Sequence, residues 1–495
     1  MRRSGILMHI SSLPSSYGIG SMGKSAYDFV DFLKDAGQSV WQLLPINPTG
    51  YGDSPYQALS TFAGNPYFVD INRLVSEGLL TRDESKKCNF GSDRTHVDYG
   101  KLSEGRMPLL QIAFERFDVK DEDFLRFVEE KKWWLEDYAL FMALKEQNGG
   151  LPWTEWEENI RMRDSEALEE CKHKLRQKCL FHYFVQYKFF EQWKELHEYA
   201  AKNGISIIGD VPIYVPMDSA DVWSNPGMFQ LDENLAPIII AGCPPDAFSA
   251  DGQRWGNPIY DWEKMEKDNF AWWVKRLTAA TEVYDTVRID HFRGIESYWA
   301  IPAEEETAIN GEWRKGPGMK LIRAIKEALP EADFIAEDLG FLTPEVIAMQ
   351  KESGFPGMKI LQFAFDSRES GNYLPYTYLP DSVCYTGTHD NETLVQWQGE
   401  ITEDDLQAAR EYMQLGEEDN LCKEMLRLGM NSVSNLFVAQ LQDYLQLGAW
   451  ARMNKPSTLN SQNWTWRAKK SEISKALAKE IYTLTKRSGR LVKDK

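Results

Sequence analysis

Residues 319–338 read MKLIRAIKEALPEADFIAED and contain, within one stretch, the alternation that decides the fold. The spacing of apolar residues over 319–329 is typical of an amphipathic helix. Phe334, Ile335 and Ala336 then form a short apolar run, typical of a buried strand, which ends at the acids Glu337 and Asp338. A helix that leads directly into a buried strand is the repeating unit of a parallel α/β fold.

Similar units occur on both sides of this stretch. Apolar strands are predicted at 5–10, 39–46, 205–210, 286–290, 334–338, 358–365, 382–386 and 436–441. Helices are predicted between them at 25–36, 182–201, 270–280, 319–329, 344–351 and 421–428. Eight such strands predict a parallel sheet that is covered on both faces and closes into a (β/α)8 TIM barrel rather than an open doubly wound sheet. The family resemblance described below favours the same choice.

Two segments interrupt this regular alternation. Residues 71–180, after the second strand, are charged and helix-like and are far longer than an ordinary connection, so we expect an inserted, mostly helical subdomain. Residues 213–268 are rich in Pro, Gly, Asp and Trp, which predicts a loop-rich insertion that forms a lid over the carboxyl-terminal face of the barrel. We therefore expect the barrel to consist of residues 1–70 and 181–495.

Composition excludes several classes of partner. The 495 residues include 75 acidic and 56 basic ones, a net charge of −19, which disfavours nucleic acids and anionic membrane surfaces. The chain has no apolar stretch of about 20 residues that could cross a bilayer, and its first residues lack the apolar region of a secretory signal. Six scattered cysteines favour free thiols, so we expect a cytoplasmic protein. Composition does not indicate an oligomeric state.

One motif points to nucleotides. Residues 18–25, GIGSMGKS, match both G-x-G-x-x-G and the phosphate-binding pattern G-x-x-x-x-G-K-[ST]. A phosphate-binding loop requires a buried strand that leads directly into the first glycine. The preceding residues 11–17, SSLPSSY, are polar and contain a proline, so we interpret these glycines as a loop that leads into a helix. A P-loop ATPase remains an alternative function.

Acidic residues cluster at the ends of three predicted strands: RIDHFRG at 288–294, AEDLG at 336–340 and GTHDNET at 387–393. In a barrel, the carboxyl ends of the strands surround one pocket, so these clusters should meet there. A structural role as an ion pair or helix cap is the alternative for any single acid. Metal binding is a further alternative, but no D-x-D or H-x-x-x-H spacing supports it. Paired carboxylates are what cleavage of a glycosidic bond requires.

Nine ordered motifs make the chain similar to the amylomaltase or 4-α-glucanotransferase (disproportionating enzyme) family of the α-amylase superfamily, over nearly its whole length. They are LPSSYGIGSMG at the amino-terminal end, YGDSPYQALSTFAGNPYF (51–68), GDVPIYV (209–215), PPDAFSADGQRWGNPIYDW (244–262), RIDHFRG, AEDLG, GTHDNET, LQDYLQL (441–447) and RMNKP (452–456).

The resemblance implies a role for each matching residue. Asp290 would be the nucleophile, Glu337 the general acid and base, and Asp390 the stabiliser of the transition state. The residues implied to bind substrate are Ser54, Tyr56, Asp210, Phe248, Gln253, Trp255, Arg288 and His389. Because alternate residues of a strand point the same way, Arg288 is expected to hold Asp290 ionised, and Asp210 either braces Arg288 or contacts sugar. The implied substrates are maltooligosaccharides and α-1,4-glucans, and no cofactor or metal is expected.

The expected reaction is the transfer of glucosyl or maltooligosyl segments to the 4-hydroxyl of an acceptor by a retaining double displacement. An α-glucan hydrolase with the same acids is the nearest alternative. A glucan-binding protein without catalysis is a further one, which three intact acids argue against.

Overall fold

The computed structural model describes residues 2–245, 249–340, 342–368 and 372–492. Eight parallel strands form its main sheet, in the order β10-β11-β12-β1-β2-β3-β6-β9. Their bounds are β1 Arg3–Leu7, β2 Val40–Gln42, β3 Ser206–Pro212, β6 Thr286–Asp290, β9 Asp333–Ala336, β10 Gly357–Ile360, β11 Ser382–Tyr385 and β12 Leu436–Gln440. The Ala336 N–H donates to the Pro356 carbonyl at 3.0 Å, which joins the two outer strands of this order. The predicted (β/α)8 barrel is confirmed.

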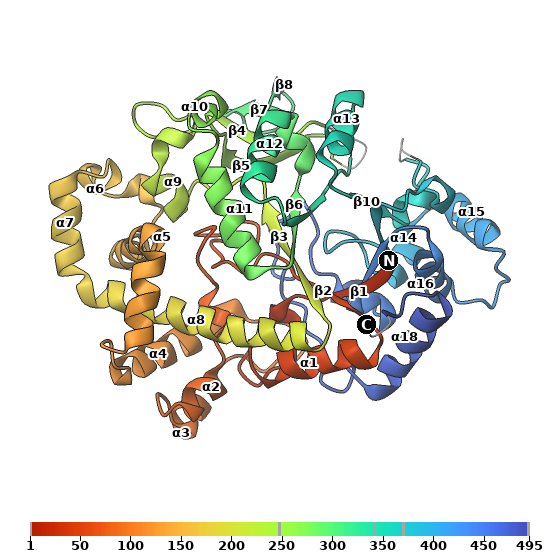
Figure 1. The fold of residues 1–495 in the computed structure, drawn as a ribbon, viewed down its shortest axis with the longest axis horizontal. Coiled ribbons are helices and arrows are strands. Elements are labelled where there is room, and N and C mark those ends of the chain that lie inside the picture. Colours follow the sequence, from red (N-terminus) through yellow and green to blue (C-terminus); the bar gives the residue numbers. More distant parts are fainter. Residues whose placement is uncertain (1, 246–248, 341, 369–371, 493–495) are drawn as a thin grey trace.

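Helices surround the barrel, as Figure 1 shows. They are α1 Lys24–Asp35, α8 Arg176–Lys202, α11 Ala271–Val283, α12 Met319–Ala328, α13 Pro344–Ser353, α14 Leu394–Glu400, α15 Glu403–Met413, α16 Leu421–Asn431, the short α17 Leu441–Tyr444, and α18 Lys475–Arg487. Several strands are shorter than predicted. The apolar run at 39–46 forms only a three-residue strand, and the run at 358–365 ends in a 3₁₀ turn, Gln362–Phe365. Apolar runs thus locate the strands better than they delimit them.

Residues 71–180 are largely helical, in agreement with the helix-like sequence. They form α2 Ile71–Ser76, α3 Arg82–Lys87, α4 Tyr99–Arg116, α5 Glu122–Gln147, α6 Glu158–Arg161 and α7 Ser165–Lys174. The long α8 then crosses the predicted boundary at 180 and packs on α5 as well as on β3 and α1. The chain therefore passes from this region into the barrel through one continuous helix, and the boundary at 180 stays a prediction.

A second, antiparallel sheet follows the order β5-β4-β7-β8. Its strands are β4 Ile239–Cys243, β5 Gln253–Pro258, β7 Ser297–Pro302 and β8 Glu312–Lys315. Two of these strands, together with α9 Ala220–Ser224 and α10 Trp262–Lys267, lie within the segment expected to be loop-rich. The sheet joins that segment to the chain just after β6, so residues 213–268 are fixed beside the strand that carries Asp290.

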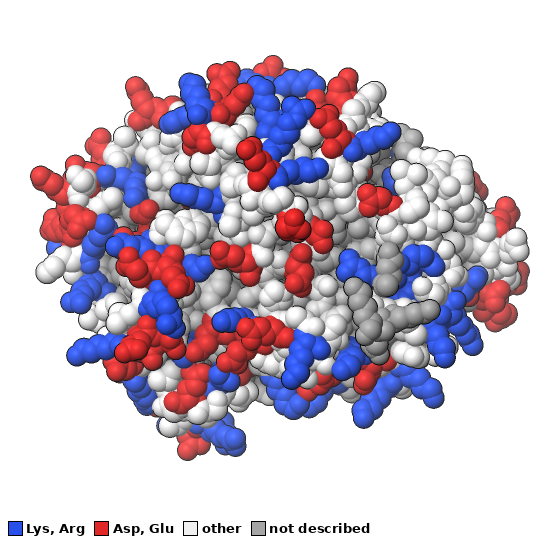
Figure 2. Space-filling view, viewed as in Figure 1, with Lys and Arg blue, Asp and Glu red and all other residues white. Residues whose placement is uncertain are grey.

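The remaining features concern the core and the surface. Tryptophans such as Trp41, Trp223 and Trp273 are fully buried, so most of the aromatic content belongs to the core. All six cysteines are free thiols. On the face shown in Figure 2, lysine and arginine side chains are interspersed with aspartate and glutamate. Within the described ranges, no helix combines the length and apolar character that a bilayer crossing requires.

Candidate active site

The carboxyl ends of β3 and β6 place three charged side chains together. The two strands are neighbours, and their register sets Asp210 beside Arg288 and Pro212 beside Asp290. Because alternate residues of a strand share a face, Arg288 and Asp290 point to the same side, while Val287 and Ile289 point to the other side and are fully buried. Arg288 Nε lies 3.4 Å from Met358 Sδ of β10, which is separated from β6 by β9 in the closed barrel. These side chains therefore occupy the barrel interior.

The Arg288 guanidinium joins two carboxylates. Its Nη1 donates to both oxygens of Asp210, at 2.7 and 2.6 Å, and to Asp290 Oδ1 at 2.9 Å. Arg288 and Asp210 side chains are 4% and 1% exposed, whereas the side chain of Asp290 is 27% exposed. The expectation that Arg288 contacts Asp290 and that Asp210 braces Arg288 therefore agrees with the geometry. Asp290 is the member of this group that a ligand can reach.

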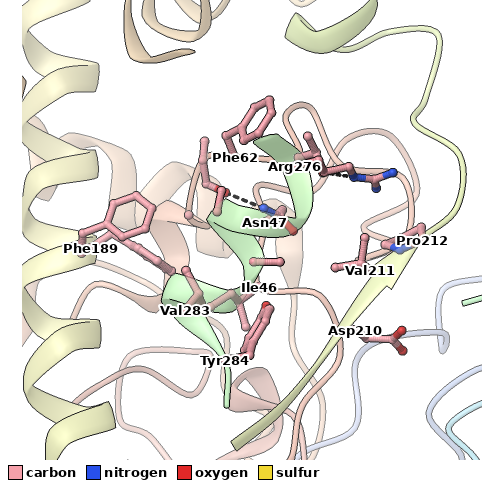
Figure 3. A pocket seen from close by; sticks show the side chains of 16 residues that line it. Ile46, Asn47, Phe62, Phe189, Asp210, Val211, Pro212, Arg276, Val283 and Tyr284 are labelled. Carbon is pink, nitrogen blue, oxygen red and sulfur yellow. Dashed lines mark hydrogen bonds between the residues drawn. The ribbon is translucent and has the colours of Figure 1, made fainter. Parts of the chain in front are cut away.

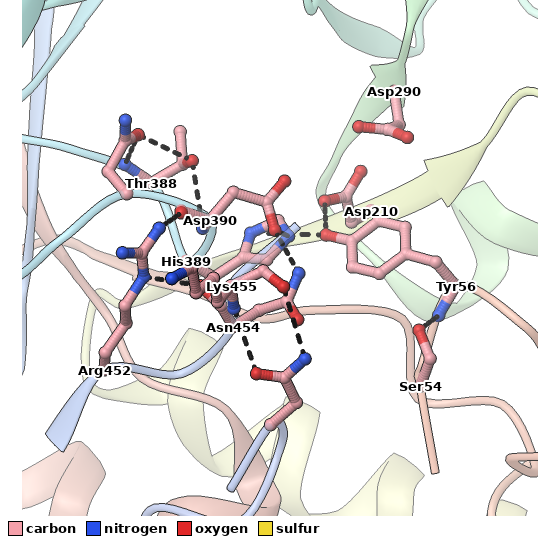
Figure 4. A network of polar contacts seen from close by, with 12 residues as sticks. Ser54, Tyr56, Asp210, Asp290, Thr388, His389, Asp390, Arg452, Asn454 and Lys455 are labelled. Atoms are coloured by element: carbon pink, nitrogen blue, oxygen red, sulfur yellow. Dashed lines mark hydrogen bonds and ion pairs between the residues drawn. The ribbon is translucent and has the colours of Figure 1, made fainter. Parts of the chain in front are cut away.

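Tyr56 and His389 form the adjoining wall, which Figure 4 shows beside Asp210 and Asp290. The Tyr56 hydroxyl donates to Asp210 Oδ2 at 2.6 Å and lies 3.4 Å from His389 Nδ1. The two rings are stacked, with centroids 4.9 Å apart and an angle of 13° between planes. Burial and the charge of Asp210 keep the pKa of Tyr56 well above its usual value, so the hydroxyl stays a hydrogen-bond donor.

Asp390 forms hydrogen bonds with two residues, Asn454 and Arg452, of the segment that follows α17. Asn454 Nδ2 donates to Asp390 Oδ1 at 2.7 Å, and His389 Nε2 lies 3.3 Å from the same oxygen. Arg452 donates to the Asp390 main-chain carbonyl at 2.6 Å and to Glu392 at 2.8 Å. The Asp390 side chain remains 45% exposed, so its second carboxylate oxygen is available to a ligand.

Glu337 follows β9 and is linked directly to the segment around Asp290. Its Oε2 accepts the His291 N–H at 2.7 Å and its Oε1 accepts the Leu339 N–H at 2.9 Å. His291 adopts the left-handed conformation, with φ of 51°, which turns the chain immediately after Asp290. The residue next to Asp290 therefore holds the carboxyl group of Glu337, and the two acids lie in one site.

Burial raises the pKa values of both Asp290 and Glu337, and the charge of Arg288 acts against this in both. The neighbouring carboxylates of Asp210, Glu337 and Asp390 raise the pKa of Asp290 further. Two carboxyl groups in one site are costly to ionise at the same time, because the charge of each disfavours the charge of the other. Asp290 contacts a guanidinium, while Glu337 forms no ion pair within the described part of the chain. The contact with Arg288 favours ionised Asp290, whereas burial favours protonated Glu337 against the two N–H bonds that it accepts, which lower its pKa.

Trp255 and Gln253, on β5 of the small sheet, lie beside the segment that follows Asp290. Trp255, on β5, packs edge-on against His291, with ring centroids 4.8 Å apart and an angle of 90°. Its Nε1 donates to Gln253 Oε1 at 3.1 Å, and Ser54 Oγ accepts the Tyr56 N–H at 3.3 Å. Phe248, the remaining predicted site residue, lies outside the described residues.

A separate pocket lies on the flank of the barrel, between α8, α11 and the chain that follows β2. Phe62, Phe189 and Val283 line it, with Arg276 at its edge (Figure 3). Asp210 borders this pocket, but its carboxylate points away from it and toward Arg288. The flank pocket is therefore distinct from the site that contains Asp290 and Asp390.

The glycine motif at 18–25 forms a packed loop that leads into α1, as expected. A Cβ on Gly23 would come within 2.0 Å of Asp70 Oδ2, so a carboxylate already occupies the space beside the start of α1 where a phosphate would bind. Arg467 binds the Gly18 carbonyl at 2.9 Å. Among the described residues, no group of three or more His, Cys, Asp or Glu side chains is arranged to hold a metal ion.

Comparison with known proteins agrees with this geometry. The profile of the family described as 4-alpha-glucanotransferase matches residues 8–473. The chain belongs to this family. The 4-alpha-glucanotransferase of Clostridium butyricum is 50% identical over 98% of this chain and 100% of its own length. That of Thermus thermophilus is 45% identical over 99% of both chains. An amylomaltase of Streptococcus agalactiae, solved in complex with acarbose, superposes with a TM-score of 0.95 at 40% identity, covering 99% of this chain and 100% of its own.

Within this 4-alpha-glucanotransferase fold, the site contains residues for which the sequence predicted no role. Asn454 and Arg452 contact Asp390, although they lie more than 60 positions further along the chain. The motif RMNKP was evident in the sequence, but neither spacing nor periodicity indicates which strand end it approaches. The assigned roles of the predicted residues stay predictions.

Proposed function

We propose that this chain performs 4-α-glucanotransfer, the activity of its family, by a retaining double displacement at Asp290 and Glu337. The observation that carries the proposal is a pair of acids joined through His291. One carboxylate contacts a guanidinium, and the second carboxyl group is buried and forms no ion pair among the described residues. Such a pair supplies a nucleophile and a proton donor in one site. The proposed substrates are α-1,4-glucans such as maltooligosaccharides.

In the first step, an oxygen of Asp290 attacks the anomeric carbon of the donor and the glycosidic bond breaks. Glu337 gives its proton to the departing oxygen, so the reducing-end fragment leaves as an alcohol. The other fragment stays bound to Asp290 as a glycosyl ester. Asp390, on the open side, stabilises the positive charge that develops on the sugar ring during this step.

In the second step, the Glu337 carboxylate removes the proton from the 4-hydroxyl of an acceptor glucan. That oxygen attacks the anomeric carbon, and the bond to Asp290 breaks. Two inversions give net retention, so each new bond is α-1,4 like the bond that was cleaved. Neither step uses a metal ion or a nucleotide.

Tyr56 supports the proposal because its ring, stacked on the buried His389, places an aromatic side chain beside the acids. An apolar ring that faces a sugar shields its C–H groups from water, while nearby polar atoms bind its hydroxyls. Burial lowers the pKa of His389, which keeps its ring neutral and able to accept a hydrogen bond. Ser54, Gln253 and Trp255 complete the proposed substrate contacts.

Incubation with maltotriose, followed by chromatography of the products, tests the function. Transfer gives free glucose together with a ladder of longer maltooligosaccharides, whereas hydrolysis gives only shorter sugars. We expect the ladder, and the same ladder after treatment with EDTA and without nucleotide.

Lys24→Ala, in the glycine motif, is the control and should retain activity. Asp290→Asn, Glu337→Gln and Asp390→Asn should each lose the ladder; activity near wild type in any of these three variants would contradict the proposal.

A further inference from the structure

The loop at residues 386–394 connects β11 to α14 and carries both His389 and Asp390. Its interior turn is stabilised locally, since Asn391 Oδ1 accepts the Thr388 N–H at 2.8 Å and Thr388 Oγ1 accepts the Asp390 N–H at 3.3 Å. Such bonds set the shape of the turn but do not fix its position relative to the barrel. Asn454 and Arg452 contact the middle of the loop at Asp390, and its position depends in addition on what holds its two ends.

Asp443 holds both ends. Its Oδ2 accepts the Thr386 hydroxyl at 2.6 Å, and its Oδ1 accepts the Leu394 N–H at 2.8 Å. Thr386 is the first residue after β11, and Leu394 is the first residue of α14. Asp443 itself lies on α17, directly after β12, the strand next to β11. One side chain thus connects the start and the end of the loop to the adjacent barrel strand.

Burying a carboxyl group at this position lowers the stability of the fold. Asp443 is 1% exposed, and it takes part in no ion pair among the residues that the structure describes. Burial raises its pKa to about 7, while its two hydrogen bonds act in the opposite direction. An uncompensated buried carboxyl group lowers stability relative to a neutral side chain of the same shape. Retaining one here is therefore better explained by the two bonds to the loop than by stability alone.

We propose that Asp443 is a positioning residue that fixes the 386–394 loop so that Asp390 and His389 face the nucleophile Asp290. The inference rests on the proposed function, in which Asp390 acts on the reacting sugar. It assigns a role to the motif LQDYLQL, for which the sequence indicated none. Asp443 does not contact substrate; it acts through the loop.

Asp443→Ala removes both bonds and is the principal test. Displacement of catalytic groups by about 1 Å costs on the order of 100-fold in rate, so we expect kcat with maltotriose to fall roughly 30–100-fold while KM changes less than about threefold. Rates are expressed per active site, which is counted with a fluorinated glycosyl fluoride that traps the ester on Asp290. Asp443→Asn keeps an acceptor for Leu394 and a donor for the oxygen of Thr386, so it should restore most of the rate.

Asp405→Ala is the matched control. Asp405 on α15 is also buried, and its carboxylate likewise accepts two hydrogen bonds from one segment, the Ser367 N–H and hydroxyl, but it does not contact the 386–394 loop. This variant should lose thermal stability without losing kcat per active site. If Asp443→Ala behaves like Asp405→Ala, the positioning role is wrong. Should Asp443→Ala fail to fold, Thr386→Val, which removes one bond only, decides the same question.

A double-mutant cycle separates this inference from the proposed function. In an Asp390→Asn background, Asp443→Ala should cause less than about a threefold further loss, because the group being positioned is already disabled. A full additional loss there would contradict positioning of Asp390. If Asp390→Asn alone is fully active, the proposed function fails. If Asp390→Asn is severely impaired and Asp443→Ala is normal, only the positioning role fails.

Discussion

At the scale of single residues, Asp290 and Glu337 show how two acids of similar intrinsic pKa obtain different tasks. Burial raises the pKa of both acids, but Asp290 contacts the guanidinium of Arg288 directly, which favours its ionised form, while Glu337 has no such contact among the described residues. A nucleophile must be ionised and a general acid must be protonated at the same pH. The surroundings of the two side chains therefore support the proposed roles, which their chemistry alone would leave interchangeable.

This assignment predicts the pH dependence. Activity should fall at low pH, as Asp290 takes up a proton, and at high pH, as Glu337 loses the proton that it must donate. α-Maltosyl fluoride as donor needs no proton on its leaving group, so initial fluoride release should lose the alkaline limb. Glu337→Gln should therefore release fluoride at a near-normal initial rate, while its rate with maltotriose falls by roughly 10³-fold. Equal losses with both donors would contradict the role of Glu337 as acid.

Asp210 provides a second prediction at this scale, concerning stability. It is 2% exposed and accepts bonds from both Arg288 and Tyr56. Asp210→Asn leaves the buried guanidinium with Asp290 as its remaining carboxylate, and breaking a buried ion pair costs about 3–5 kcal/mol. We expect a clear fall in the thermal unfolding midpoint. Asp28→Asn, which breaks the exposed pair between Lys24 and Asp28, is the control and should leave the midpoint unchanged.

At the scale of elements, β5 is the part of the small sheet that reaches the site. Trp255 on this strand packs on His291, the residue that follows Asp290. Once the glycosyl ester has formed, Glu337 can activate either water or an acceptor sugar, and water is far more abundant. Transfer therefore depends on binding the acceptor and on limiting the access of water. A rigid strand positions Trp255 better for this purpose than a free loop would.

We predict that Trp255→Ala loses transfer more than hydrolysis. The measurement is the ratio of reducing ends released to glucosyl units transferred with maltotriose, and this ratio should rise in the variant. Trp133→Ala, at a half-exposed tryptophan on α5, is the control and should leave the ratio unchanged. If both rates fall together in Trp255→Ala and the ratio stays constant, β5 does not separate transfer from hydrolysis.

The elements also show which strands and site residues the sequence predicts, and why it does not predict the others. Buried barrel strands are continuous apolar runs, so TVRID at 286–290 was predicted with its observed bounds. Two strands of the small sheet show no such run, since every residue of β8 is exposed and β5 contains Gly, Asn and Pro. The strand-end acids could be grouped because barrel geometry brings them together. The contacts of Asn454 and Asp443 could not be predicted, because they depend on tertiary structure that no local pattern encodes.

At the scale of the whole molecule, the two ends of the described chain meet beside the first and last barrel strands, as Figure 1 shows. Helix α18 packs on α1 and α16. Just beyond it, the fully buried Arg490 donates to the main-chain carbonyls of Arg3, Met430, Ser432 and Ser434, at 2.7 to 3.0 Å. One side chain thus joins the start of β1 to the segment before β12, on the side of the barrel opposite to the catalytic carboxyl ends of the strands.

Arg490→Met should therefore destabilise the barrel without changing its chemistry. Methionine preserves much of the packing but removes four hydrogen bonds, although the Met430 and Ser432 carbonyls keep a second donor, Arg2. Hydrogen bonds to a charged group contribute about 1.5–3 kcal/mol each, although they do not add fully. We expect a loss of at least about 3 kcal/mol, measured as a lower unfolding midpoint, with kcat per trapped active site unchanged at low temperature. Arg487→Met, at an exposed position of α18, is the matched control. Equal midpoints for the two variants would show that closure of the barrel does not depend on Arg490, and that packing of α18 alone suffices.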